Sequence, residues 1–144
     1  MTRLRGSMPV VLVASMTIFA AAAAPGAATP GGAGTPAACT LVNAARASAL
    51  FGLAVTTVDR PNPISAGSST CMYMVGGRPV MQLAITVMQS EGVAQVNYRN
   101  QQHAAATHKN VGSRQKGNLV LSAITMNGDV SKMNALLDVA VKSI

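Results

Sequence analysis

An alternation of apolar and polar residues gives the clearest structural signal in the chain. The apolar members of this alternation are Met81, Leu83, Ile85 and Val87. Such a period of two is typical of a half-buried β-strand. Residues 68–75 also have strand composition, and Gly76-Gly77 between the two segments suits a tight turn. The pattern therefore predicts a β-hairpin over residues 68–87.

The hairpin predicts a position for three methionines. If Gly76-Gly77 forms the turn, Met72 lies opposite Met81, and Met74 lies on the same side, two residues along. We expect all three in the core, because methionine fills irregular gaps between other apolar side chains. The alternative is a Cu(I) site, since thioethers are soft ligands. The opposite side of the hairpin would then carry Cys71, Tyr73, Val80 and Gln82.

Three segments show the period of a helix. Residues 39–52 repeat apolar side chains at helical spacing, with Thr40 as a candidate cap and Gly52 at the end. Ser90 is expected to cap a second helix that follows it. Asp129 is expected to cap a third, whose apolar face is the most regular of the three. That face comprises Val130, Met133, Leu137, Ala140, Val141 and Ile144.

Shorter segments complete the expected fold. Strands are predicted at 53–59, at 118–126 and, more weakly, in the residues just before 118. The resulting order is α-β-β-β-α-β-β-α. Runs of adjacent strands favour an α+β fold, in which helices pack on one face of an antiparallel sheet of four or five strands.

The N-terminal residues have the pattern of an export signal. Residues 1–24 combine two arginines, an apolar run and a series of alanines, as in a secretory signal peptide. An uncleaved membrane anchor is the alternative. Residues 25–38 contain only Pro, Gly, Ala and Thr, which predicts a disordered linker. Residues 39–144 are then a single domain, in the periplasm or secreted.

The chain has two cysteines, Cys39 and Cys71, and both follow the expected signal. An oxidising compartment favours a disulfide between them. Two alternatives are a lipid anchor on Cys39 and a redox or metal site. Neither fits well, because the residues before Cys39 lack an apolar lipobox and the chain has no C-x-x-C motif.

Charge suggests the kind of partner. The chain has 11 basic and 4 acidic residues; without Arg3 and Arg5 the balance is 9 against 4. The densest basic stretch holds Lys109, Arg114 and Lys116, a candidate basic surface patch. It has no aromatic residues for base stacking, so we do not expect nucleic acid. For an exported domain, envelope proteins, anionic polymers or lipid surfaces are the expected partners.

Motifs of catalysis are missing from the sequence. It has neither a Gly-Lys-Ser/Thr phosphate loop nor a G-x-S-x-G nucleophile elbow. Asp129 and Asp138 have helix roles, which leaves Asp59 and Glu91 for acid-base chemistry, in segments far apart in the sequence. We expect neither an enzyme nor a cofactor.

Four motifs carry a resemblance to known proteins. They are "CTLV" from Cys39, Gly52, "CMY" from Cys71 and "NGDVSKMNALLDVAV" from Asn127. This layout resembles small exported domains of unknown function, including lipoprotein families common in actinobacteria. The resemblance implies a disulfide between the two cysteines and no catalytic site. The chain departs from it by lacking a lipobox and by having Tyr73 where many relatives carry Trp.

The sequence thus predicts an exported, disulfide-stapled, non-catalytic domain that binds an envelope component or a protein partner. The alternative is a periplasmic Cu(I)-binding protein that uses the methionines.

Overall fold

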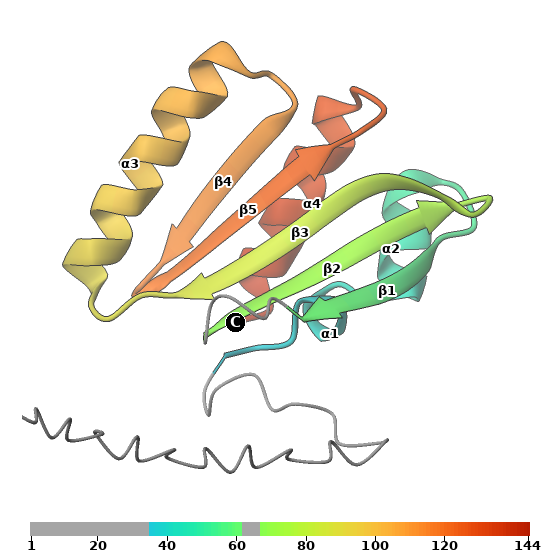
Figure 1. Ribbon diagram of the computed structural model, residues 1–144. Helices are drawn as coiled ribbons and strands as arrows, with labels where there is room; N and C mark the ends of the chain where they lie inside the picture. The colour runs from blue at the N-terminus through green and yellow to red at the C-terminus, as the bar shows by residue number, and fades with distance from the viewer. Residues whose placement is uncertain (1–34, 62–66) are drawn as a thin grey trace, which may run out of the picture.

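A computed structural model describes residues 35–61 and 67–144 of the chain (Figure 1). The expected signal peptide, 1–24, and most of the expected linker, 25–38, lie outside the described residues. The described elements, in chain order, are α1 (Ala38–Leu41), α2 (Ala44–Phe51), β1 (Thr56–Pro61), β2 (Ser68–Val75), β3 (Arg78–Val87), α3 (Glu91–Thr107), β4 (Val111–Lys116), β5 (Leu119–Thr125) and α4 (Val130–Lys142).

The α+β prediction is confirmed. Five strands form one antiparallel sheet in the order β1-β2-β3-β5-β4, and the helices pack on it. The observed order is α-α-β-β-β-α-β-β-α, because the expected first helix is divided in two. Asn43 begins the second part, α2, and its side chain accepts a hydrogen bond from the Arg46 amide. Thr40 is therefore not the cap; its hydroxyl donates to the Ala37 carbonyl.

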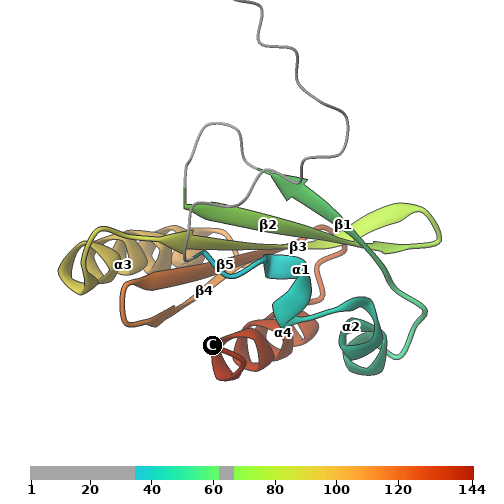
Figure 2. The same ribbon diagram turned by 90° about the horizontal axis from the view of Figure 1, so that it is seen from below.

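One face of the sheet carries the main core. Figure 2 shows α1, α2 and α4 on the same side of the strands. The strand residues at the centre of this side, in β2, β3 and β5, are almost fully buried, and α4 packs across the sheet with Met133, Leu136, Leu137 and Ala140. Gly112 of β4 makes the close approach possible, since a Cβ there would lie 2.9 Å from the Met133 Cε atom.

Helix α3 lies on the other side of the sheet, which corrects the expectation that all helices share one face. It packs on β4 and β5, along the edge of the sheet seen in Figures 1 and 2. Leu121 belongs to the main core, whereas its neighbour Val120, whose side chain points the opposite way, is buried outside that core. Of α3 itself, only Ala94 is fully buried. A helix with so small an apolar contact gives no clear signal of the face it covers.

The register of the β2–β3 hairpin also differs from the prediction. Next to the turn, Met74 pairs with Pro79, but a β-bulge follows and Tyr73 then pairs with Met81. The extra residue is Val80, which packs against the core beside Met81. Because a shift of one residue exchanges the two faces of a strand, Met72 pairs with Gln82 and not with Met81.

Three predicted helix ends are confirmed. The Ser90 hydroxyl accepts from the Val93 amide at the start of α3, and Asp129 accepts from the Lys132 amide at the start of α4. Gly52 ends α2 in the left-handed conformation, with φ of 67°. Local chemistry alone sets these positions, which is why the sequence identifies them.

Candidate functional site

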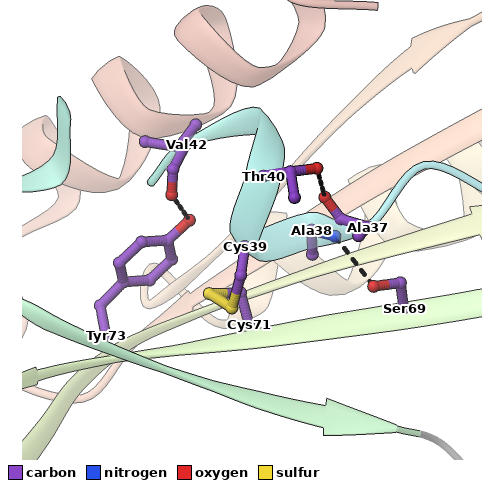
Figure 3. The surroundings of a disulfide bond; sticks show 8 residues. All are labelled: Ala37, Ala38, Cys39, Thr40, Val42, Ser69, Cys71 and Tyr73. Carbon is purple, nitrogen blue, oxygen red and sulfur yellow. Dashed lines mark hydrogen bonds between the residues drawn. A yellow bond between two sulfur atoms is a disulfide. The ribbon is translucent and has the colours of Figure 1, made fainter. Parts of the chain in front are cut away.

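The two cysteines form the predicted disulfide. The sulfur atoms of Cys39 and Cys71 are bonded at 2.08 Å, and the bond ties α1 to β2 (Figure 3). Cys71 is fully buried. The Cys39 sulfur is therefore not available for a lipid anchor, and the chain has no free thiol for a redox or metal site.

Hydrogen bonds beside the disulfide also hold α1 against β2. The Tyr73 hydroxyl donates to the Val42 carbonyl at 2.9 Å, and the Ala38 amide donates to the Ser69 hydroxyl at 2.8 Å (Figure 3). Burial raises the pKa of the Tyr73 phenol far above its ordinary value. The ring of Phe51 packs edge-on against Tyr73. Because the buried phenol stays neutral and its hydroxyl holds the Val42 backbone in place, we assign Tyr73 a structural role.

The three methionines do not form one site. Met81 lies in the core, whereas Met72 and Met74 are half-buried on the opposite face of the sheet, because the bulge reverses the faces. Cys71 and Tyr73, which were expected away from Met81, share the core face with it. Within 35–61 and 67–144, no group of three or more His, Cys, Asp or Glu residues could hold a metal ion.

Two members of the expected basic patch bind the domain's own last helix. The Arg114 guanidinium lies 2.9 Å from the Asp138 carboxylate of α4. The Lys116 ammonium contacts the backbone oxygens of Val141 and Ile144, at 3.4 and 2.6 Å. A cation is favourable there, because the carbonyl end of a helix carries partial negative charge. Lys109 lies at the other end of β4, in the turn after α3, and is exposed.

The two acids left for catalysis lie on separate elements. Asp59 is on edge strand β1, and Glu91 is in the first turn of α3, which packs at the other edge of the sheet. Both are exposed. The described structure thus gives this carboxylate pair no shared site.

The fold does form an apolar crevice, which the sequence did not predict. It lies at the end of the face that carries the main core, between the end of α2, the turn end of the hairpin and the start of α4. Buried Phe51 and Met81 line it together with Val75, Val80 and Leu53, and its volume is about 40 Å³. Asn127 and Lys132 bring polar atoms to it.

One apolar side chain of the crevice is largely exposed at the surface. Leu53 lines the crevice and is 53% exposed. We call this surface, Leu53 together with the crevice, the apolar rim.

The apolar rim left no clear signal in the sequence. Leu53 directly follows the helix-ending Gly52, a position where an apolar residue that packs back on the last helical turn is common. A larger hollow, of about 400 Å³, lies along α3, but its described lining comes from one helix alone. Without a second wall, it gives a ligand little contact, and the crevice is the better-formed candidate.

The described residues include no helix with the length and apolar character needed to cross a membrane. No model of a known protein family matches the chain, and no curated protein proved similar to it. Of what the resemblance to exported domains implied, the structure shows the disulfide.

Proposed function

We propose that this chain is a non-catalytic binding domain, stapled by its disulfide, that works outside the cytoplasm and holds a protein partner of the cell envelope. The observation that carries the proposal is the apolar rim. A crevice with an apolar lining and an exposed leucine, Leu53, at its edge is a common feature of protein-binding surfaces.

Two further features support this proposal. The Cys39–Cys71 bond is the kind that persists in oxidising compartments. The nine basic and four acidic side chains of residues 35–144 give an excess of positive charge, which favours an acidic partner. The cationic residues are spread over the fold, and Arg114 and Lys116 contact α4, so a continuous basic surface for a polymer or lipid is a weaker explanation.

The test uses the tagged full chain in a host that exports it. Intact mass of the protein from the extracytoplasmic fraction, with and without reductant, gives the oxidation state. Chemical crosslinking before extraction then shows whether the chain is recovered in a complex with a protein partner at a fixed ratio. An oxidised, exported protein in one defined protein complex is expected.

Other results decide against the proposal. Retention in the cytoplasm with two free thiols would remove the extracytoplasmic role. Exported protein that stays monomeric and sediments with lipid vesicles or polymer would replace the protein partner with an anionic surface.

A further inference from the structure

We propose that α3 is a lid, which opens from the sheet as one unit while the main core stays folded. In the closed position, α3 covers β4 and β5 on the second face of the sheet, the side opposite the main core. Opening gives solvent access to that face without unfolding the domain. Such a device is independent of the apolar rim and of the partner proposed above.

Few apolar atoms hold α3 on the sheet. Of its 17 residues only Ala94 is fully buried, whereas the shorter α4 buries Met133, Leu136, Leu137 and Ala140. Burial of apolar surface is the main force that holds a helix in place, and one methyl group supplies little of it. An element with so small a buried contact belongs at the low end of local stability.

Helix α3 also leaves its larger apolar side chains at the surface. Val93 is 48% exposed and Val96 is 59% exposed. Both line the hollow of about 400 Å³ along α3, with Gly92, Asn97 and Asn100 of the same helix. These valines therefore add little to the free energy that holds the lid closed.

Polar contacts do not compensate for the small apolar contact. The Gln101 side-chain amide donates to Asn97, and that of Gln102 donates to the Tyr98 hydroxyl, so both bonds stay within the helix. Among residues 35–61 and 67–144, no side-chain hydrogen bond or ion pair joins α3 to the sheet.

Two buried polar atoms oppose the closed position. Gln101 Oε1 on α3 and Ser113 Oγ on β4 are buried and make no hydrogen bond with the described residues. Because its neighbour Gly112 faces α4, Ser113 points to the opposite side of the sheet, where α3 packs. A buried polar atom without a partner costs free energy, and contact with water on opening removes that cost.

The rest of the domain is held together without α3. The main core contains no α3 residue. Strand β4 is held from the other side, where Gly112 lies against Met133 and Leu137 of α4. Arg114 of the same strand pairs with Asp138. The lid can therefore leave while β4 remains in the sheet.

Opening would enlarge an apolar face that is already partly exposed. On the second face, the register places five residues in one row across the sheet: Val58, Met72, Gln82, Ile124 and Val111. Val58 is 44% exposed and Ile124 is 37% exposed. Val120 lies on the same face and is 1% exposed, so it reaches water only when the lid is open.

The experiment is hydrogen exchange of the oxidised full chain, followed by NMR at a series of low urea concentrations. A detached helix of 17 residues is marginal in water, so its amides exchange when the lid opens. We expect the amides of residues 96–101 to exchange through one common opening, at least about 100-fold faster than those of Leu136 and Leu137 in α4. Exchange in α3 should respond weakly to urea, because the opening exposes little surface.

One variant with a matched control tests the cause. Ser113→Ala removes the unpaired hydroxyl and should slow exchange in α3 at least about fivefold, since the closed position loses its penalty. Ser122→Ala makes the same change at the paired position of β5, where the residue is half-buried, and should alter the exchange by less than about twofold. Spectra of both variants check that each is folded.

Three outcomes would overturn the proposal. Equal exchange of α3 and α4 amides at every urea concentration would mean that α3 opens only with global unfolding. Rates that fall gradually from the ends of α3 towards its middle would mean fraying and no common opening. Unchanged or faster exchange with Ser113→Ala would mean that this hydroxyl does not oppose the closed position.

Discussion

Tyr73 shows how a single polar atom fixes the packing of the first helix. Its ring lies in the core, and its hydroxyl donates to the Val42 carbonyl, 31 residues earlier in the chain. The replacement Tyr73→Phe keeps the ring but leaves that buried carbonyl without its partner. We expect the free energy of unfolding to fall by about 1–2 kcal/mol, measured by urea denaturation.

The matched control is Tyr98→Phe on α3. The Tyr98 hydroxyl accepts from the Gln102 side chain at an exposed position, so its loss should cost about 0.5 kcal/mol or less. Equal losses in the two variants would mean that the Tyr73 hydrogen bond contributes no more than a surface contact.

Two glycines make a contrasting pair. Ala at Gly112 would place its Cβ about 3 Å from Met133 and Leu137, which press on the strand from α4. We expect Gly112→Ala to lower the free energy of unfolding by about 1–3 kcal/mol and to shift the methyl signals of both side chains.

Gly52→Ala should act by another route. Its surroundings are open, but its φ of 67° is strained for alanine, so a cost of about 1–2 kcal/mol is expected. Because the cause is local backbone strain, the methyl signals of α4 should stay in place. A change in those signals with Gly52→Ala, or none with Gly112→Ala, would contradict this assignment.

Single residues also show what the sequence can predict. Ser90, Asp129 and Gly52 were identified as helix ends because each acts on backbone within four residues. The disulfide was predicted because two cysteines leave one pairing. The apolar rim was not predicted, since Leu53, Val75 and Lys132 come together only through the packing of three distant elements.

At the scale of elements, the stability of α4 depends on pH through its N-cap residue, Asp129. The backbone amide of Lys132 donates to the Asp129 carboxylate and, with the nearby ammonium, lowers the pKa of that carboxyl. A lowered pKa in the folded state means that the stabilisation is complete above about pH 4, the ordinary Asp value. It is lost as the pH falls further, through the pKa of the folded protein.

Asp129→Asn tests this dependence, because asparagine caps a helix without a charge. We expect the wild type to be more stable than the variant at pH 6, and the difference to shrink below pH 4. Urea midpoints at a series of pH values give the comparison, with Asp59→Asn on the edge strand as control. A difference that stays constant with pH would show that the charge of Asp129 does not stabilise α4.

The hairpin shows why the faces of an element were harder to predict than its existence. The strands and their turn were predicted, but the bulge at Val80 reverses the faces beyond it. The alternation of Met81, Leu83 and Ile85 gives no indication that Val80, on the turn side, is an extra residue in the strand. The copper hypothesis depended on the unbulged register, and so it depended on the one feature that the pattern does not contain.

For the whole molecule, the disulfide is the main covalent constraint on the fold. It joins residues 32 apart in the sequence, and closing a loop of that size contributes roughly 3–4 kcal/mol on the chain-entropy model. That is a large share of the 5–15 kcal/mol typical of a domain. We expect reductant to lower the wild-type stability by about this amount.

The double variant Cys39→Ser, Cys71→Ser should match the reduced wild type and be indifferent to reductant. Thermal and urea unfolding of both proteins check this. Equal stability of oxidised and reduced wild type would mean that the Tyr73 and Ser69 hydrogen bonds are enough to hold α1 on the sheet.

The overall architecture was predictable where adjacent strands set it. Three strands, a helix, two strands and a helix leave few antiparallel arrangements, and the observed sheet is one of them. The face of the sheet on which α3 packs was not predictable. The one fully buried residue of α3, Ala94, is too small to give the helix a distinct apolar face in the sequence.

The disulfide also decides how the domain would respond to a mechanical load. A pull on the chain just before Cys39 passes through the sulfur bridge directly into β2, so α2 and β1 carry none of it. When the oxidised domain is stretched between its two ends, the residues between the cysteines stay looped. The unfolded length is then shorter by roughly 110 Å, about 3.5 Å for each of the 32 residues of separation. A domain built in this way can lose its sheet under force while the chain from Cys39 to Cys71 remains a closed ring.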